Sequence, residues 1–213
     1  MKIGIIGASG KAGSLILKEA VSRGHEVTAI VRDAAKADAE SAAVLEKDIF
    51  ALTAADIQPF DVVVNAFGAP LGQEHLHVEA GRVLIGALQG APATKLIVVG
   101  GAGSLYVDEA KIVRLVDTPE FPEIFKATAT NQLTNLDELI SSTGIKWTFI
   151  SPSAYFNPEG KRTGTYTKGK DHLLVNAKGE SYVSYADYAI AVVDEIEHPQ
   201  HENERFTLVS EAE

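Results

Sequence analysis

Three glycines spaced three residues apart follow the first apolar segment of the chain, in the run Gly7-Ala8-Ser9-Gly10-Lys11-Ala12-Gly13. Binding a phosphate through the main chain requires a sharp turn, N–H groups unobstructed by a Cβ atom, and the positive end of a helix. We expect Gly7 to make the turn, Gly10 to allow the close approach, and Gly13 to let the next helix pack tightly. Because a strand-like segment precedes the run and an amphipathic helix follows it, the spacing predicts a dinucleotide-binding turn.

Lys11 suggests a second reading, the loop that binds nucleoside triphosphates. That loop needs four residues between two glycines, and a serine or threonine after the lysine. Here Gly4 and Gly10 enclose five residues, and Ala12 follows Lys11. The spacing therefore excludes the triphosphate loop.

The residues just after the second apolar segment should meet the ribose of the adenosine. Arg32 and Asp33 stand there, about 20 residues past the glycine turn, where the ribose contact is expected. A carboxylate at this place accepts a hydrogen bond from the 2′-hydroxyl of NAD, whereas a guanidinium accommodates the 2′-phosphate of NADP. Arg32 comes first, so the order favours NADP, with NAD as the alternative.

Other candidate residues follow further apolar segments, because a ligand of an open α/β sheet lies beyond the carboxyl ends of its strands. Asp48 ends the third predicted strand, and we expect it to meet the adenine together with Ile49. The candidate cofactor-binding residues are Gly7, Ser9, Gly10, Lys11, Ala12, Gly13, Arg32, Asp48, Ile49, Ala66, Phe67, Gly68, Gly100 and Gly101.

Short, almost continuous apolar segments alternate with helical patterns along the chain. Strands joined through helices and buried on both faces form a parallel sheet with right-handed crossovers. The fold class is therefore α/β, a Rossmann-type, doubly wound, mainly parallel sheet. Helical periodicity predicts helices after the glycine turn, over Glu74–Gln89 and from Phe125 to Ile140, ending near Gly144. The predicted strands are Lys2–Ile6, Val27–Val31, Val44–Asp48, Asp61–Val64, Leu96–Val99, Trp147–Ile150 and Phe206–Val209.

The sequence pattern changes after residue 150, where glycine, proline and lysine become frequent. Two short strand-like pieces, Gly164–Thr167 and His172–Val175, are expected to pair as a hairpin. Ser184 opens a further helix with capping-box spacing, with Asp187 in place of the usual glutamate. We expect one NAD(P)-binding domain over residues 1–213, in which 151–183 form a small extension on the substrate side.

Composition restricts the possible partners. The 213 residues include 19 Lys+Arg against 29 Asp+Glu, a formal net charge of −10, and no cysteine. The negative charge disfavours nucleic acid and anionic membranes, and the lack of cysteine excludes disulfides and thiolate metal sites.

The first apolar run ends at Gly7, too early for a signal peptide or a membrane span. His75 and His77, two residues apart on a helix, point to different faces. We therefore expect a cytoplasmic protein without a metal, a nucleic-acid partner or a membrane anchor.

With these turns identified, the chain resembles the atypical short-chain dehydrogenase/reductase superfamily, and within it the NADH-flavin reductase-like group, akin to flavin and biliverdin reductases. The resemblance covers essentially the whole chain. It implies a Rossmann sheet, NAD(P)H bound across the strand ends, and hydride transfer to a flavin such as FMN or FAD, or to a similar planar acceptor. The motifs that carry it are the glycine turn, Val31-Arg32, Val98–Leu105, Ser151–Ala154, Gly160–Gly164 and Asp187–Ala191.

The catalytic branch of that superfamily uses a tyrosine with a lysine four residues later, in which the lysine lowers the pKa of the tyrosine. Tyr106 is followed at that distance by Ala110, and Lys126 is preceded by Pro122. We therefore expect no alcohol–ketone chemistry by this mechanism. Flavin reduction needs only a hydride donor and an acceptor held face to face. Ser104 is the candidate hydroxyl near the nicotinamide, or else a helix cap. Tyr155 is the candidate residue beside the acceptor, or else a packing residue.

Two functions remain open from the sequence. The first is an NADPH-preferring oxidoreductase that reduces a small planar acceptor. The alternative is a non-catalytic NADP-binding redox sensor of the nitrogen-metabolite-repressor type. A third possible function is that of a sugar-nucleotide epimerase, which the sequence favours less because the C-terminal region is short for a substrate lobe. The basic cluster Lys161, Arg162, Lys168 and Lys170 would either bind an anionic acceptor such as FMN or lie in a solvated hairpin.

Overall fold

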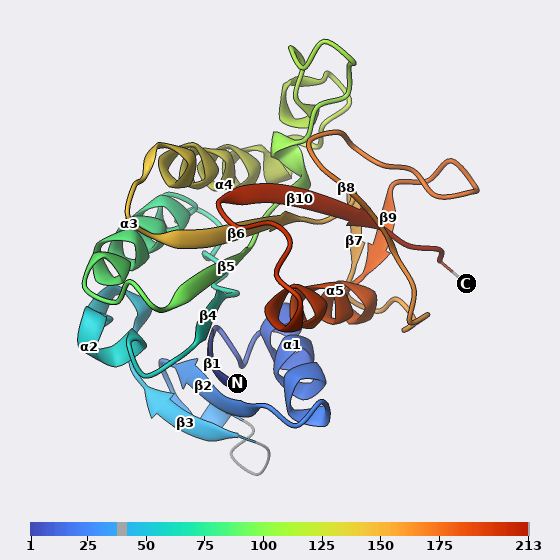
Figure 1. Ribbon diagram of the computed structural model, residues 1–213. Coiled ribbons are helices and arrows are strands. Elements are labelled where there is room, and N and C mark those ends of the chain that lie inside the picture. Colours follow the sequence, from blue (N-terminus) through green and yellow to red (C-terminus); the bar gives the residue numbers. More distant parts are fainter. Residues whose placement is uncertain (38–41, 213) are drawn as a thin grey trace.

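An eight-stranded sheet forms the centre of the molecule, with the strand order β3-β2-β1-β4-β5-β6-β10-β8 (Figure 1). The structure is a computed structural model that describes residues 1–37 and 42–212. Neighbouring strands of this sheet pair in parallel, except that β8 runs antiparallel to β10. The strands are β1 (Lys2–Ile6), β2 (Glu26–Val31), β3 (Ala43–Glu46), β4 (Val62–Asn65), β5 (Lys95–Val99), β6 (Lys146–Ser151), β8 (Thr167–Gly169) and β10 (Glu204–Val209).

The strand order reverses between β1 and β4. From β1 the chain first builds outward through β2 to β3, and it then crosses back to place β4 on the other side of β1. Ligands of open α/β sheets bind at such a reversal, beyond the carboxyl ends of the strands. The predicted Rossmann-type fold is confirmed, and its reversal lies directly behind the glycine turn.

Helices cover both faces of the sheet. On one face, α1 (Lys11–Ser22) packs against α5 (Tyr185–Glu197), and on the other α3 (Leu76–Gln89) packs against α4 (Glu123–Ser141) and the short α2 (Ala54–Ile57). The last turn of α4 is followed by Gly144, whose φ of +74° suits the predicted helix end. The described residues also form the 3₁₀ turns η1 (Ala34–Lys36), η2 (Ile49–Ala51), η3 (Ala102–Ser104) and η4 (Leu115–Asp117).

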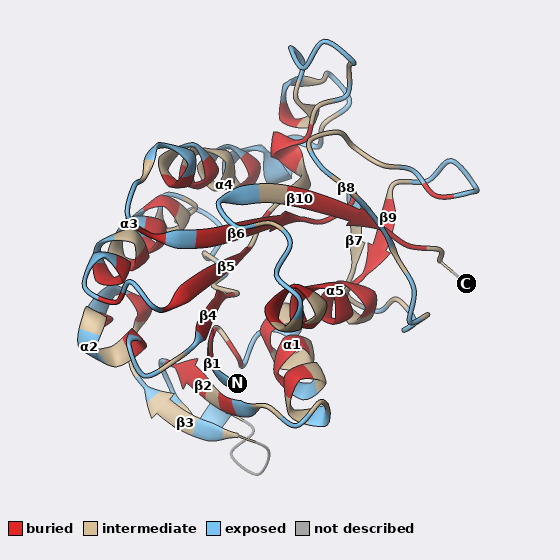
Figure 2. Cartoon of the chain, viewed as in Figure 1, coloured by how far each residue is buried: buried red, intermediate tan, exposed pale blue. Residues whose placement is uncertain are grey.

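The central strands are buried on both faces, as their continuous apolar sequences require. All four residues of β4 are buried, and so are the last four of β1 (Figure 2). The prediction that Asp48 ends the third strand is wrong, because β3 stops at Glu46. Asp48 instead caps η2 by accepting a hydrogen bond from the Phe50 amide at 3.0 Å.

The hairpin predicted in the extension is wrong. Instead of pairing with His172–Val175, β8 adds to the sheet edge along β10, where Thr167 lies opposite Val209. His172 forms an isolated bridge with Tyr106, far back in the sequence. The rest of the extension contributes a second, two-stranded sheet of β7 (Tyr155–Asn157) and β9 (Tyr182–Ser184). Partners from distant segments were available to both pieces, and local spacing does not reveal them.

Half of the predicted capping box at Ser184 is present. The Ser184 hydroxyl accepts a hydrogen bond from the Asp187 amide at 3.0 Å, which caps α5. The buried carboxylate of Asp187 turns away from Ser184 and binds the extension, accepting from the Thr163 and Gly164 amides at 2.9 Å and from the Thr163 hydroxyl at 2.7 Å. Asp187 therefore fastens the 160s loop to α5.

No helix in the described part of the chain combines the length and apolarity that crossing a bilayer demands.

Candidate functional site

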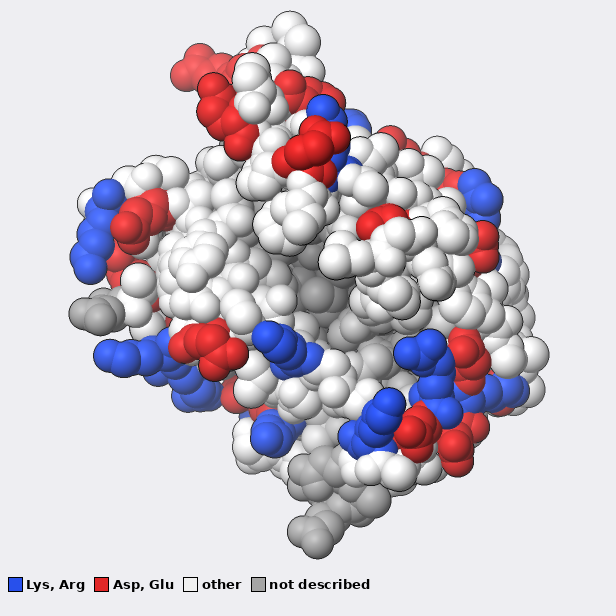
Figure 3. All heavy atoms as spheres, turned by 180° about the vertical axis from the view of Figure 1, so that it is seen from behind, with Lys and Arg blue, Asp and Glu red and all other residues white. Residues whose placement is uncertain are grey.

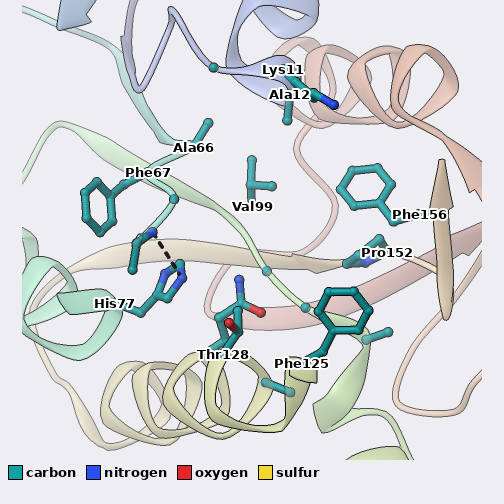
Figure 4. A pocket seen from close by; sticks show the side chains of 18 of the residues that line it. Lys11, Ala12, Ala66, Phe67, His77, Val99, Phe125, Thr128, Pro152 and Phe156 are labelled. Carbon is teal, nitrogen blue, oxygen red and sulfur yellow. Dashed lines mark hydrogen bonds between the residues drawn. The ribbon is translucent and has the colours of Figure 1, made fainter. Parts of the chain in front are cut away.

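A cavity of about 1080 Å³ lies beyond the carboxyl ends of the parallel strands. Its walls include Ile6 at the end of β1, Val31 at the end of β2, and Val99 at the end of β5. In Figure 4, Lys11 and Ala12 reach the cavity from α1, while Phe125 and Thr128 reach it from α4 on the opposite side. A cavity of this size at the sheet reversal can enclose a dinucleotide and part of a second molecule.

The glycine turn forms one wall of the cavity, with Gly7, Ser9, Gly10, Lys11 and Ala12 among its lining residues. Gly7 has a φ of +74°, and a Cβ on it would stand 2.5 Å from the Ala66 carbonyl oxygen. The first strand therefore turns into α1 at a place where the chain leaves no room for a side chain.

Gly13 lies behind the cavity wall and does not line it. A Cβ on Gly13 would overlap the carbonyl oxygen of Gly7, so this glycine lets α1 rest on the turn. The helix begins at Lys11 with Gly10 as its N-cap; no side chain caps it, and its first turn has no acidic residue. Its opening N–H groups thus face the cavity ready for an anion. The uncapped start of α1 fits a pyrophosphate, and Cβ atoms at Gly7 and Gly13 would collide with the backbone that forms this turn.

Arg32 and Asp33 behave differently although they are neighbours. Arg32 lines the cavity, and its exposed guanidinium has no ion pair or hydrogen bond with any described residue. Asp33 is not among the lining residues, since its carboxylate caps η1 by accepting from the Ala35 amide at 3.1 Å. The side chain available to a ribose at this end of the cavity is therefore the cation.

The next strand ends supply the wall expected beside the adenosine. Ile49 lines the cavity, whereas Asp48 caps η2 and is not among the lining residues. Lys47 also lines it, a residue that the sequence analysis did not single out, with its ammonium bound to Asp56 at 2.7 Å. No sequence pattern points to Lys47, because the direction of its side chain depends on the bend between β3 and η2.

The turn after β4 lines the cavity as predicted, with Ala66, Phe67 and Gly68. The Asn65 side chain holds this turn by accepting from the Phe67 amide at 3.1 Å. His77 of α3 also lines the cavity and meets the Phe67 ring edge to face at 5.8 Å. Burial lowers the pKa of His77, so its imidazole is neutral near pH 7 and accepts weakly from the Ala69 amide at 3.4 Å.

The turn after β5 is built of small residues for two reasons. Gly100 and Gly101 line the cavity, as expected. A Cβ on Gly100 would overlap the Phe149 ring, and one on Gly101 would overlap the Gln132 side chain. The residues of this turn are therefore small both because they line the cavity and because they pack against Phe149 and Gln132.

Ser104 does not reach the cavity. It ends η3, is 4% exposed, and is not among the lining residues. Its hydroxyl accepts from the buried guanidinium of Arg205 at 3.0 Å. The role predicted for Ser104 beside the nicotinamide has no support from this position.

Tyr155 stands at the cavity rim, 61% exposed, and its ring also packs against that of the buried Tyr182, with centroids 5.6 Å apart. Next to it, Phe156 and Tyr185 lie with ring centroids 3.8 Å apart, and both line the cavity. Burial raises the pKa of Tyr185, which keeps its hydroxyl protonated. This end of the cavity is aromatic.

Four lining residues of α4, Phe125, Thr128, Ala129 and Gln132, were not predicted as site residues. Their spacing places them on one helix face, and this was the signal available in the sequence. The sequence analysis predicts this helix from Phe125 to Ile140 but assigns none of its residues to the site. Phe125 is in fact 57% exposed and projects into the cavity (Figure 4).

One tyrosine in the chain does have a lysine four residues later, namely Tyr166 with Lys170, a match that the sequence reasoning overlooked. The Tyr166 hydroxyl donates to Asp194 at 2.7 Å, and Lys170 pairs with Glu204 at 3.4 Å. Neither residue is among those lining the cavity. This pair therefore lies on the outside of the extension, and the cavity itself contains no such pair.

The basic cluster of the extension is also outside the cavity. Arg162 pairs with Glu19 at 3.1 Å, and Lys168 donates to Gln200 at 2.6 Å. Among the described residues, no group of three His, Cys, Asp or Glu side chains is placed to hold a metal ion.

Comparisons with known proteins agree with this geometry. A family model described as NAD(P)H-binding matches residues 7–199. The chain is 69% identical over 213 residues to the uncharacterized protein YwnB of Bacillus subtilis (strain 168), and the match covers 100% of both chains. A crystal structure from Streptococcus pneumoniae TIGR4, named as a putative NADH-flavin reductase, is 46% identical, with a TM-score of 0.94 over 99% of this chain and 100% of that one. A structure from Bacteroides thetaiotaomicron, named as a putative epimerase, is 36% identical, with a TM-score of 0.85 over 98% and 96%.

Proposed function

The chain belongs to the NAD(P)H-binding family, and from this premise we propose that it is a reductase that prefers NADPH and passes a hydride to a planar, flavin-like acceptor. The cofactor it binds is a nicotinamide dinucleotide. The choice of NADPH and the identity of the acceptor are the parts that we propose.

One observation carries the proposal: the uncapped start of α1 and the unpaired Arg32 line the same cavity. The α1 amides would hold the pyrophosphate, and Arg32 would pair with the 2′-phosphate. Asp33, the residue that would bind the ribose hydroxyls of NAD, is occupied with the Ala35 amide. This division of roles supports NADPH over NADH.

The opposite end of the cavity suits a planar acceptor. When bound, the nicotinamide would supply a hydride with both electrons, and the acceptor would take one proton from solvent. Phe125, Phe156 and Tyr185 would hold the acceptor ring by stacking and keep bulk water from the reacting face. The Streptococcus pneumoniae relative, named for flavin reduction with NADH, supports this acceptor class.

A second candidate is the NADP-binding redox sensor, favoured by what α4 presents to the cavity. Its polar pair there is Thr128 and Gln132, which cannot perform the tyrosine–lysine proton transfer of the wider superfamily. A sensor needs cofactor binding but no turnover. The sensor and the reductase therefore differ in one measurable property.

Calorimetry with NADPH and NADH, combined with NADPH consumption in the presence of riboflavin, FMN or a quinone, tests the proposal. We expect NADPH to bind more tightly than NADH and at least one acceptor to be reduced. Tight binding without turnover on any of them would favour the sensor. Binding of neither nucleotide would overturn both functions.

A further inference from the structure

The two ends of the cavity differ in charge. Three lining cations, Lys11, Arg32 and Lys47, come from α1 and the ends of β2 and β3, where the dinucleotide phosphates would lie. We call the other part, lined by η4, the start of α4 and the residues after β6, the acceptor end. Of the described lining residues there, the one with a charge is Glu120.

The surface around the cavity shows the same division. On the face shown in Figure 3, which is hollowed near its middle, most of the Lys and Arg lie below the hollow, with Asp and Glu among them, and the segment that projects above it carries mainly Asp and Glu. The cations of the extension that would serve an anionic acceptor are engaged elsewhere, Arg162 with Glu19 and Lys170 with Glu204. A phosphate on the acceptor would therefore meet no lining cation at the acceptor end and would face a carboxylate.

Thr128 and Gln132 are the polar residues that α4 contributes to the cavity wall, one helical turn apart. Other polar side chains of this helix bond back to its own carbonyls: Asn131 to Ala127 at 2.9 Å and Thr134 to Thr130 at 3.1 Å. Thr128 and Gln132 make no hydrogen bond within the described part of the chain. Both are thus available to a bound molecule, and Figure 4 shows Thr128 pointing into the cavity.

The Gln132 side chain occupies the space that a side chain at position 101 would need. A Cβ on Gly101 would overlap the Gln132 carboxamide, so the missing side chain leaves the amide space at the turn after β5. A carboxamide presents an N–H donor and a C=O acceptor side by side. This pattern complements an imide edge, in which a ring N–H adjoins a carbonyl.

We infer that the acceptor end binds an uncharged flavin, riboflavin rather than its phosphorylated forms, and that Gln132, with Thr128 beside it, hydrogen-bonds the imide edge of the ring. The inference rests on the proposed function for the hydride donor. It names a substrate class and a specificity-determining residue that the cofactor assignment alone does not supply.

The first test compares riboflavin with FMN, which differ by a single phosphate, through quenching of flavin fluorescence on the NADP⁺-loaded protein. We expect riboflavin to bind at least about threefold more tightly, the size of effect that one partly screened charge produces. Glu120→Lys should reduce or reverse the difference. FMN binding as tightly as riboflavin or more tightly, or no binding of either flavin, would overturn the inference.

The second test examines the imide edge. Gln132→Leu should weaken riboflavin binding about tenfold, because the variant loses one buried hydrogen bond and leaves the imide group of the flavin without a partner. Riboflavin methylated at the imide nitrogen should lose a similar factor with the wild type and nothing further with Gln132→Leu, because the two changes remove the same bond. If the two changes instead weakened binding independently, so that their factors multiplied, Gln132 would not contact the imide and its proposed role would be refuted.

Thr128→Val is a second variant, expected to weaken riboflavin binding severalfold. Its matched control is Thr130→Val, the same change on an exposed position of the same helix that does not line the cavity. NADPH affinity, measured by calorimetry on every variant, checks that the dinucleotide site is intact. If wild type binds NADPH but fails the flavin tests, only this inference falls; if it binds no NADPH, the proposed function falls with it.

Discussion

Arg32 faces the cavity with its guanidinium unpaired, whereas the adjacent Asp33 turns its carboxylate back onto the Ala35 amide, 3.1 Å away. The 3₁₀ turn η1 thus gives two neighbouring residues different roles, in the order that the sequence favoured. The turn needs a cap, and Asp33 provides it.

Arg32→Ala should weaken NADPH binding about 10- to 100-fold, the loss expected for a charge-assisted contact to phosphate. NADH, which lacks the 2′-phosphate, should lose no more than about threefold, because an exposed charge contributes little by itself. Calorimetry with both nucleotides measures the two affinities. Lys36→Ala, a nearby exposed cation that does not line the cavity, is the control. Equal losses for NADPH and NADH would remove Arg32 from the 2′-phosphate.

Gly13→Ala should destabilise the protein by about 1–3 kcal/mol, the usual cost of overpacking, because its Cβ would meet the rigid carbonyl of Gly7. It should also abolish tight dinucleotide binding, since α1 must shift away from the turn. Denaturant unfolding and calorimetry read the two effects.

The control for this substitution is Gly86→Ala in α3, where a Cβ meets nothing within 4 Å. There the change should stabilise the chain by about 0.5–1 kcal/mol through helix propensity. If both variants behaved alike, the close packing of Gly13 on Gly7 would not be what holds the turn.

Tyr155→Ala should raise KM for the acceptor severalfold and leave the Kd of NADPH unchanged, because Tyr155 stands at the rim of the acceptor end. Ser104→Ala should behave in the opposite way. It removes a hydrogen-bond acceptor from the buried Arg205, at a cost of about 1–3 kcal/mol in unfolding free energy, and it should leave kcat within about twofold. A steady-state comparison of both variants, together with urea unfolding, decides the matter. A large fall in kcat for Ser104→Ala would restore that hydroxyl to the reaction.

Asp56 gives the stability of the fold an acid-dependent component. Hydrogen bonds from Lys47 and Thr53 lower the pKa of Asp56 from 3.8 to about 2. A carboxylate whose pKa is lowered on folding stabilises the folded state above its unfolded pKa and loses that effect as the pH falls through the folded value.

Asp56→Asn should therefore reduce the free energy of unfolding by about 1 kcal/mol near pH 6, the value of a helix cap. The difference from wild type should shrink below pH 4 and vanish near pH 2. Urea unfolding across this range measures it. Asp61→Asn is less suitable as a control because its carboxylate binds the Lys2 amide; Glu79→Gln, an exposed carboxylate of α3, serves better. A difference that stayed constant down to pH 2 would contradict the ion-pair origin.

Much of the fold could be predicted because its signals are local. Each central strand is a continuous apolar segment, and the glycine turn must follow β1 whatever the rest of the chain does. The resemblance to the short-chain dehydrogenase/reductase superfamily is confirmed. Twelve of the fourteen predicted cofactor residues line the cavity, and the two exceptions, Gly13 and Asp48, lie behind it or cap a turn.

What could not be predicted depends on distant partners. β8 leaves its expected hairpin because the edge of β10 is free to receive it. The Ser104 hydroxyl is buried against Arg205, which lies about a hundred residues further along the chain and donates a hydrogen bond to it. Thr128 and Gln132 have no special sequence context, and only the packing of α4 over the turn after β5 turns them toward the cavity. NADPH preference, a cytoplasmic location and the roles of individual residues remain predictions.

The walls of the cavity come from widely separated parts of the chain, from Ile6 in the first strand to Tyr185 in the last helix. A dinucleotide bound there would contact residues from the N-terminal and C-terminal halves of the chain at once. The unfolded chain offers no comparable binding site. At a hundredfold excess over Kd, such a molecule adds about 2.7 kcal/mol to the folding free energy. The stability of the folded chain is thus expected to rise with the concentration of the dinucleotide.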